Sequence, residues 1–90
     1  MRAKFRLGLL LVTRGVVEAI PVGGEVFDGL ARHVSGDWGE VCPEDQALND
    51  RALVDGDRLL SAYTTEGGTK FWITTEADRS ATTVLLPDEY

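Results

Sequence analysis

Cysteine and histidine each occur only once in this chain of 90 residues, as Cys42 and His33. A single cysteine excludes an internal disulfide and a thiolate metal cluster. We expect Cys42 to be a small, half-buried packing residue in a reducing compartment, with a reactive thiol at a helix start as the alternative. Paired histidines, an HExxH motif and EF-hand spacing are all missing, so the sequence predicts no metal and no cofactor.

Long apolar runs are also missing. The aliphatic stretch near the N-terminus, residues 7–12, stops at the polar pair Thr13-Arg14. It is shorter than the ~7–15 apolar residues of a secretory signal, and no Ala-x-Ala cleavage pattern follows it. Nothing in the sequence approaches the length of a membrane span. We therefore expect a cytoplasmic protein that does not bind a membrane.

Basic residues are few, because nine Lys and Arg accompany 15 Asp and Glu, and the net charge is −6 with a sequence pI of about 4.6. A nucleic-acid-binding surface needs Lys and Arg to displace counterions from phosphates. The scattered basic residues therefore predict no direct binding of DNA or RNA. A negative protein is suited instead to a basic protein surface, including that of a protein that itself holds nucleic acid. The oligomeric state is left open.

The composition, 43% apolar and 27% charged, is typical of a folded protein, and residues 1–90 are long enough for one domain. Thr13 and Pro43 are suited to begin helices, and Gly56 to end one. Gly29 inside a helix indicates that another group packs closely against it. The loop Val22-Gly23-Gly24 separates the first two helices. Helical spacing of apolar residues predicts helices over residues 14–20, 25–34 and 43–55.

From Leu59 onward the apolar period changes to 2, which is typical of strands. Gly67-Gly68 predicts a hairpin with a two-residue turn, which would place Tyr63 opposite Trp72. The aliphatic residues 7–12 are predicted to form a short buried strand or extended segment. Strands are predicted over residues 59–65, 70–75 and 81–86. The expected fold is therefore α+β, with two to three helices packed on a three-stranded antiparallel β-meander.

Most residues that can do chemistry lie between His33 and Asp50, a segment without Lys or Arg. Gly36 and Gly39 flank Asp37-Trp38 and permit a tight turn. Trp38 either folds inward over the core or stands outward as an aromatic anchor among carboxylates. The loop with Asp78 and Arg79 is either a second contact surface or an internal link to the acidic segment. The candidate partner-binding residues are Asp37, Trp38, Glu40, Glu44, Asp45, Asp78 and Arg79.

A catalytic alternative uses His33 and Asp37 as an acid–base pair in a small hydrolase or nuclease. His33 would otherwise be a half-buried histidine bonded to a carbonyl or carboxylate. Magnesium bound by Asp37 with Glu40 or Glu44 is a further alternative. A nucleophilic serine motif and a phosphate loop are both missing. An open cleft around His33 would favour chemistry, and a closed internal network would favour binding.

Four stretches together resemble a family of small "plasmid-related" proteins of bacterial plasmids, integrative elements and phages. The resemblance covers nearly the whole chain and implies a mobile-element context, but it carries no established activity and no site residues. The stretches are Arg32-His33-Val34-Ser35-Gly36-Asp37-Trp38-Gly39, Arg58-Leu59-Leu60-Ser61-Ala62-Tyr63, residues 72–83 and Leu85-Leu86-Pro87-Asp88-Glu89-Tyr90.

A small acidic protein of mobile DNA has one recurring physical use, which is to occupy a basic nucleic-acid-binding surface on a host defence enzyme. We therefore expect a non-enzymatic inhibitor of the anti-CRISPR or antirestriction type, acting on a nucleic-acid-binding defence complex. The hydrolase described above is one alternative. A regulatory or toxin–antitoxin accessory protein is the other.

Overall fold

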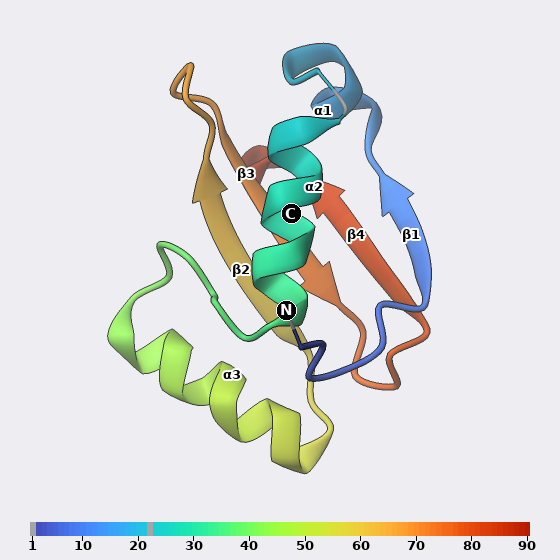
Figure 1. Ribbon diagram of the computed structural model, residues 1–90, viewed down its shortest axis with the longest axis vertical. Helices are drawn as coiled ribbons and strands as arrows, with labels where there is room; N and C mark the ends of the chain where they lie inside the picture. The colour runs from blue at the N-terminus through green and yellow to red at the C-terminus, as the bar shows by residue number, and fades with distance from the viewer. Residues whose placement is uncertain (1, 22) are drawn as a thin grey trace.

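A computed structural model describes residues 2–21 and 23–90. It has an α+β fold in which helices pack around a four-stranded mixed sheet with strand order β1-β4-β3-β2 (Figure 1). No helix among the described residues is long and apolar enough to cross a membrane. In chain order the elements are β1 (Leu9–Val12), α1 (Arg14–Ala19), α2 (Gly24–Val34), α3 (Pro43–Asp55), β2 (Leu59–Thr64), β3 (Lys70–Thr75), β4 (Ala81–Leu85) and the 3-10 turn η1 (Pro87–Glu89).

The predicted helices are confirmed to within a residue or two at their ends. The Thr13 hydroxyl accepts a hydrogen bond from Val16 N–H at the start of α1 (3.3 Å). Pro43 is the first residue of α3, and Gly56 ends that helix with a left-handed φ of 79°. These boundaries follow from local chemistry, because caps satisfy the backbone groups that a helix end leaves free. Val22 of the predicted loop lies outside the described residues.

The predicted α+β class is confirmed, and β2, β3 and β4 pair as an antiparallel meander. The sheet is not three-stranded, however, because β1 adds a fourth strand that runs parallel to β4. Leu9 N–H donates to the Ser80 carbonyl (2.9 Å), and Thr13 N–H donates to the Val84 carbonyl (3.0 Å). Gly8 makes this approach possible with a φ of 66°, since a Cβ there would collide with the Ser80 carbonyl. β1 therefore forms an exposed edge of the sheet, rather than the buried strand expected from its aliphatic sequence.

The hairpin of β2 and β3 is confirmed, but its predicted register was wrong by one residue. Tyr63 lies opposite Phe71, and Ala62 opposite Trp72. The loop holds three residues instead of two, because Thr65 pairs with Thr69 and its hydroxyl accepts the Thr69 N–H (3.0 Å). A shift of one residue exchanges the two faces of a strand. Phe71 is therefore in the core, whereas Trp72 lies on the opposite face of the sheet.

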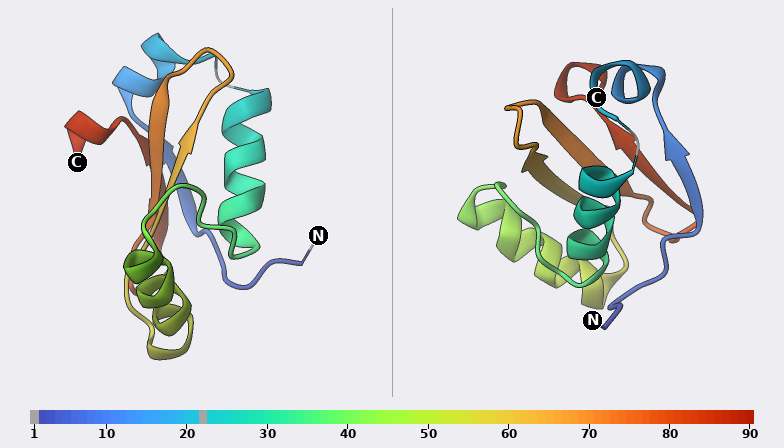
Figure 2. Two further views of the ribbon diagram at one scale, coloured as in Figure 1. Left: turned by 90° about the vertical axis from the view of Figure 1, so that its left-hand side faces the viewer. Right: turned by 45° about the horizontal axis from the view of Figure 1, so that its top comes forward.

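The main core lies between the sheet and α2, which covers one face of the sheet, while η1 lies on the other (Figure 2). A Cβ on Gly29 would lie 2.9 Å from Cε2 of Phe71, which confirms the expected close packing against this glycine. A second cluster beneath α3 joins Trp38, Ala52 and Leu59. The main core consists of Val16, Ile20, Val26, Leu30, Tyr63, Phe71, Ile73 and Val84.

Candidate functional site

The Asp37-Trp38 turn is built as its two glycines predict, with φ values of 86° at Gly36 and 74° at Gly39. The Arg32 guanidinium donates to both carboxylate oxygens of Asp37, with the shorter bond at 2.7 Å. This hydrogen bond lowers the pKa of Asp37 below its ordinary value. The Asp37 side chain is half exposed, but its carboxylate already forms a salt bridge with Arg32.

Trp38 folds inward and is only 3% exposed. Its indole N–H donates to Asp50 Oδ1 (2.9 Å), and its ring stacks on Phe5 at 6.3 Å between centroids. Burial of a large aromatic surface and a satisfied indole N–H favour this position over exposure. The inclusion of Trp38 in the contact patch was therefore wrong, and of its two predicted orientations the inward one is observed.

His33 is completely buried and lies in a closed chain of hydrogen bonds. Thr82 donates to the Leu7 carbonyl (2.7 Å), so the Thr75 hydroxyl must donate to Thr82 (2.8 Å). Nε2 of His33 then donates to Thr75 (2.8 Å), which leaves Nδ1 to accept from Ser61 (2.5 Å). Each donor has one acceptor, and this arrangement fixes a neutral imidazole with its proton on Nε2.

The predicted pair of His33 and Asp37 is not formed in the structure. The partners of His33 are hydroxyls, whereas Asp37 bonds to Arg32 and Gly39. Across residues 2–21 and 23–90, no group of three His, Cys, Asp or Glu side chains is placed to hold a metal ion. The imidazole therefore lies in the closed network that favours a structural role.

Burial lowers the pKa of His33 to about 4, with the charge of Arg79 as a smaller cause. In the unfolded chain this pKa is about 6.5, so the unfolded state binds more protons between pH 6.5 and 4. The free energy of unfolding should therefore decrease as the pH falls through this range, by about 3 kcal/mol in total. Urea denaturation at pH 7, 6, 5 and 4 measures the slope. The pKa of Asp37 is lowered, so the stability that its ionised carboxylate contributes is lost only at lower pH. A free energy of unfolding that stays constant from pH 7 to pH 4 would contradict the prediction.

Arg79 bonds within the protein, as the prediction of an internal link expected, but its partners are not in the acidic segment. Its guanidinium donates to the carbonyl oxygens of Asp57 (2.6 Å) and Ala52 (3.1 Å), at the C-terminal end of α3. It also donates to two carbonyls of its own loop. Asp78 accepts the N–H of Ser80 (3.0 Å), and the bonds from Ser80 lower its pKa. Both residues shape the β3–β4 loop.

The other predicted acids lie along the entry to α3. The Glu40 carboxylate accepts a hydrogen bond from the Thr64 hydroxyl (2.7 Å), and Glu44 and Asp45 occupy the first turn of the helix. Cys42 is exposed, which corrects the expectation of a half-buried packing residue. The Asp45 N–H lowers the pKa of its thiol, but the carboxylates of Glu44 and Asp45 outweigh that bond and the pKa is raised. A raised pKa opposes thiolate reactivity.

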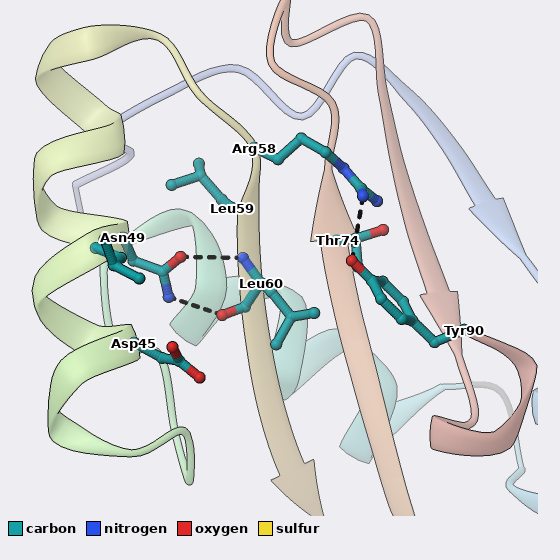
Figure 3. A pocket seen from close by; sticks show the side chains of 8 residues that line it. Asp45, Asn49, Arg58, Leu59, Leu60, Thr74 and Tyr90 are labelled. Carbon is teal, nitrogen blue, oxygen red and sulfur yellow. Dashed lines mark hydrogen bonds between the residues drawn. The ribbon is translucent and has the colours of Figure 1, made fainter.

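Glu40 and Asp45 border a groove on the face of the sheet that α2 leaves uncovered. Figure 3 shows the half of the groove that contains Asp45 and Tyr90. The groove consists of two adjoining hollows of about 310 and 400 Å³, which share Asp45, Leu60 and Tyr90. Trp72 lines its second half. The remaining lining residues are Val41, Leu48, Asn49, Arg58, Leu59, Ala62, Lys70 and Thr74.

The sequence did not reveal the aromatic part of this groove. The predicted register placed Trp72 opposite Tyr63, whereas it lies opposite Ala62, and the position of Tyr90 depends on contacts distant in sequence. Arg58 fixes Tyr90 by donating to its hydroxyl (3.1 Å) and lies 5.6 Å from its ring centroid. Trp72 meets the Tyr90 ring edge to face at 5.4 Å. With the correct register, the alternation of β3 would have placed Trp72 beside Leu60 and Ala62.

No strand pairs with the outer edge of β2 beside the groove, but other parts of the described chain form hydrogen bonds to its backbone. The Asn49 amide binds both backbone groups of Leu60, at 2.7 and 3.1 Å, in the manner of a neighbouring strand (Figure 3). Ala62 donates to the Trp38 carbonyl (3.1 Å) and accepts from Glu40 N–H (2.8 Å). These bonds fix Glu40 at the rim of the groove.

Comparisons with known proteins found no relative of this chain. The chain matches no known protein family, no curated protein and no solved structure. The resemblance to plasmid-related proteins therefore stays a prediction from the sequence.

Proposed function

We propose that this chain is a non-enzymatic binding protein whose groove receives a basic segment of a partner protein. The observation that carries the proposal is a pair of carboxylates, Glu40 and Asp45, beside the aromatic rings of Trp72 and Tyr90. Lys70 and Arg58 also line the groove, and Arg58 is paired with Glu76 (3.7 Å). A Lys or Arg side chain has an apolar stem and a cationic head. The stem packs on aromatic surface and the head pairs with carboxylates, a combination that is common at the centres of protein interfaces.

The closed environment of His33 supports binding over the hydrolase or nuclease alternative. A catalytic imidazole has to reach the proton that it transfers. His33 has no exposed surface, and its ring nitrogens already bond to Ser61 and Thr75.

The partner class follows from charge and from the resemblance to mobile-element proteins. A net charge of −6 favours association with basic surfaces, and the surfaces of nucleic-acid-binding enzymes are basic. We therefore propose an inhibitor of the anti-CRISPR or antirestriction type, acting in the cytoplasm on a nucleic-acid-binding defence complex.

The test reverses the charge of the rim in the double variant Glu40→Lys/Asp45→Lys. We expect a loss of about 10- to 100-fold in affinity for the captured defence complex, which corresponds to about 1.4–2.8 kcal/mol. Wild-type protein should also raise phage plaquing in a host that carries CRISPR and restriction systems, and the variant should not. Affinity is measured by calorimetry after a pull-down identifies the complex.

The matched control is Glu18→Lys/Asp55→Lys, which changes the net charge equally but lies outside the groove. Both control residues are exposed. Circular dichroism establishes that each variant is folded. Equal binding by the rim variant and wild type would contradict the proposal, as would capture of a toxin in place of a defence enzyme.

A further inference from the structure

The outer edge of β1 is open (Figure 1). Leu9 and Thr13 direct their N–H groups toward β4, as their bonds to Ser80 and Val84 show. Alternate residues of a strand direct their backbone groups to opposite edges. The N–H and C=O groups of Leu10 therefore point away from β4, and so do those of Val12. No strand within residues 2–21 and 23–90 pairs with this edge.

The two edges of the sheet differ in how far their outward backbone groups are hydrogen-bonded. On β2, the Asn49 amide and the backbone around Gly39 occupy the outward groups of Leu60 and Ala62. Proteins usually protect an edge with a short strand, a charge, a proline or a bulge. β1 is short, with four residues. The sequence of β1, Leu-Leu-Leu-Val, contains neither charge nor proline.

β1 also exposes apolar side chains on both of its faces. Leu9 is 64% exposed, Leu10 is 40% exposed and Leu11 is 45% exposed. Leu10 projects to the face opposite that of Leu9 and Leu11, because successive side chains of a strand alternate. A strand added at this edge would bury part of all three side chains and satisfy the free backbone groups together.

Charge selects the occupant of the edge. Four of the nine basic residues precede Glu18, and none of the 15 acids does. Beyond the C-terminal end of β1, Arg14 pairs with Glu18 (3.4 Å) and the Thr13 hydroxyl donates to Glu89 (2.7 Å), so the basic flank of the strand is its N-terminal one. That flank attracts an acidic strand, and the β1 of a second copy has no acid within it or before it. The four basic residues are Arg2, Lys4, Arg6 and Arg14, and all are exposed.

We propose that the β1 edge binds an extended segment of a partner protein in which acidic and apolar residues alternate. The segment adds to the sheet as a fifth strand, with backbone bonds to Leu10 and Val12, as in other cases of strand addition. Its apolar side chains pack on the exposed leucines, and its carboxylates face the basic N-terminal flank of β1. This surface is distinct from the groove, because β1 and β2 are opposite edges of the sheet.

The test titrates the protein with a capped synthetic peptide of alternating aspartate and valine and follows backbone amides by NMR. We expect the amide exchange of Leu10 and Val12 to slow by at least about tenfold on saturation. A peptide N-methylated on its strand-pairing edge should bind at least tenfold more weakly. A lysine–valine peptide should also bind at least tenfold more weakly.

Two variants of β1 test whether the peptide binds at this edge. Leu11→Glu adds a repelling charge on an exposed side chain, and Leu10→Pro removes an outward N–H from an edge position that tolerates proline. Each should weaken peptide binding at least tenfold. Equal binding of the N-methylated peptide would overturn the proposal. So would unchanged binding by folded Leu11→Glu, shifts confined to the groove, or dimerisation of the free protein through β1. The groove variant Glu40→Lys/Asp45→Lys should bind the peptide normally, so the two proposals fail separately.

Discussion

Replacement of His33 by alanine should lower the free energy of unfolding by about 3–5 kcal/mol, which is a large part of the stability of a small domain. The imidazole bonds to hydroxyls on two strands, Ser61 on β2 and Thr75 on β3. Its removal leaves a cavity between α2 and the sheet. It also leaves two buried hydroxyls without their partner. Urea denaturation at pH 7 measures the loss.

Phe27→Ala is the matched control for this prediction, because Phe27 lies on the same helix but is 57% exposed. Truncation of an exposed side chain away from the core should cost about 0.5 kcal/mol or less. Similar losses for the two variants would show that the network around His33 adds nothing to stability. A large loss for His33→Ala alone would locate the effect at the buried imidazole, where the cavity and the unpartnered hydroxyls act together.

Gly39→Ala should also be strongly destabilising, with an expected loss of about 2–4 kcal/mol in the free energy of unfolding. The φ of Gly39 is 74°, which alanine adopts only with strain. A Cβ at this position would also collide with the carbonyl oxygen of Ala62. The segment that carries Glu40 would have to leave the edge of β2, so partner affinity should fall as well. Thermal and urea unfolding measure the first effect, and calorimetry the second.

Gly68→Ala separates the two causes. Gly68 has a similar φ of 90°, but a Cβ there would meet no atom within 4 Å. It should therefore cost only the backbone strain, about 1–2 kcal/mol. If Gly39→Ala and Gly68→Ala destabilise the protein equally, the close approach of residues 38–40 to β2 is not needed for stability.

The parts of the fold that the sequence predicted correctly are those with local causes. Thr13, Pro43 and Gly56 act on their own helix ends, and residues within a few positions satisfy them. The period of 2 after Leu59 likewise reflects one strand at a time. Placement of β1 beside β4 has no such local signal, since Leu9 pairs with Ala81. The strand was therefore recognised, but its place in the sheet was not.

The candidate site was predicted in part for the same reason. The Asp37-Trp38 turn and the acids at the start of α3 depend on neighbouring residues, and they lie where the sequence suggested. Whether Trp38 faces inward depends on Asp50 and Phe5, which reach it from elsewhere in the fold. The groove depends on the hairpin register. Thr65 sets that register with a hydroxyl bond that a Gly-Gly signal does not reveal.

The attachment of α3 has a consequence for local unfolding. Only Asn49 and Ala52 of this helix are buried, and much of its attachment is polar: the Asn49 amide on Leu60, the indole of Trp38 on Asp50, and Arg79 on the Ala52 carbonyl. Segments with little apolar burial open at lower free energy than the core of the same protein. When α3 detaches, the Asn49 amide leaves β2 and the strand loses its cover at Leu60, while the backbone of residues 38–40 still covers Ala62. Exposure of the backbone of Leu60 at this edge of the sheet is therefore governed by the local stability of a single helix.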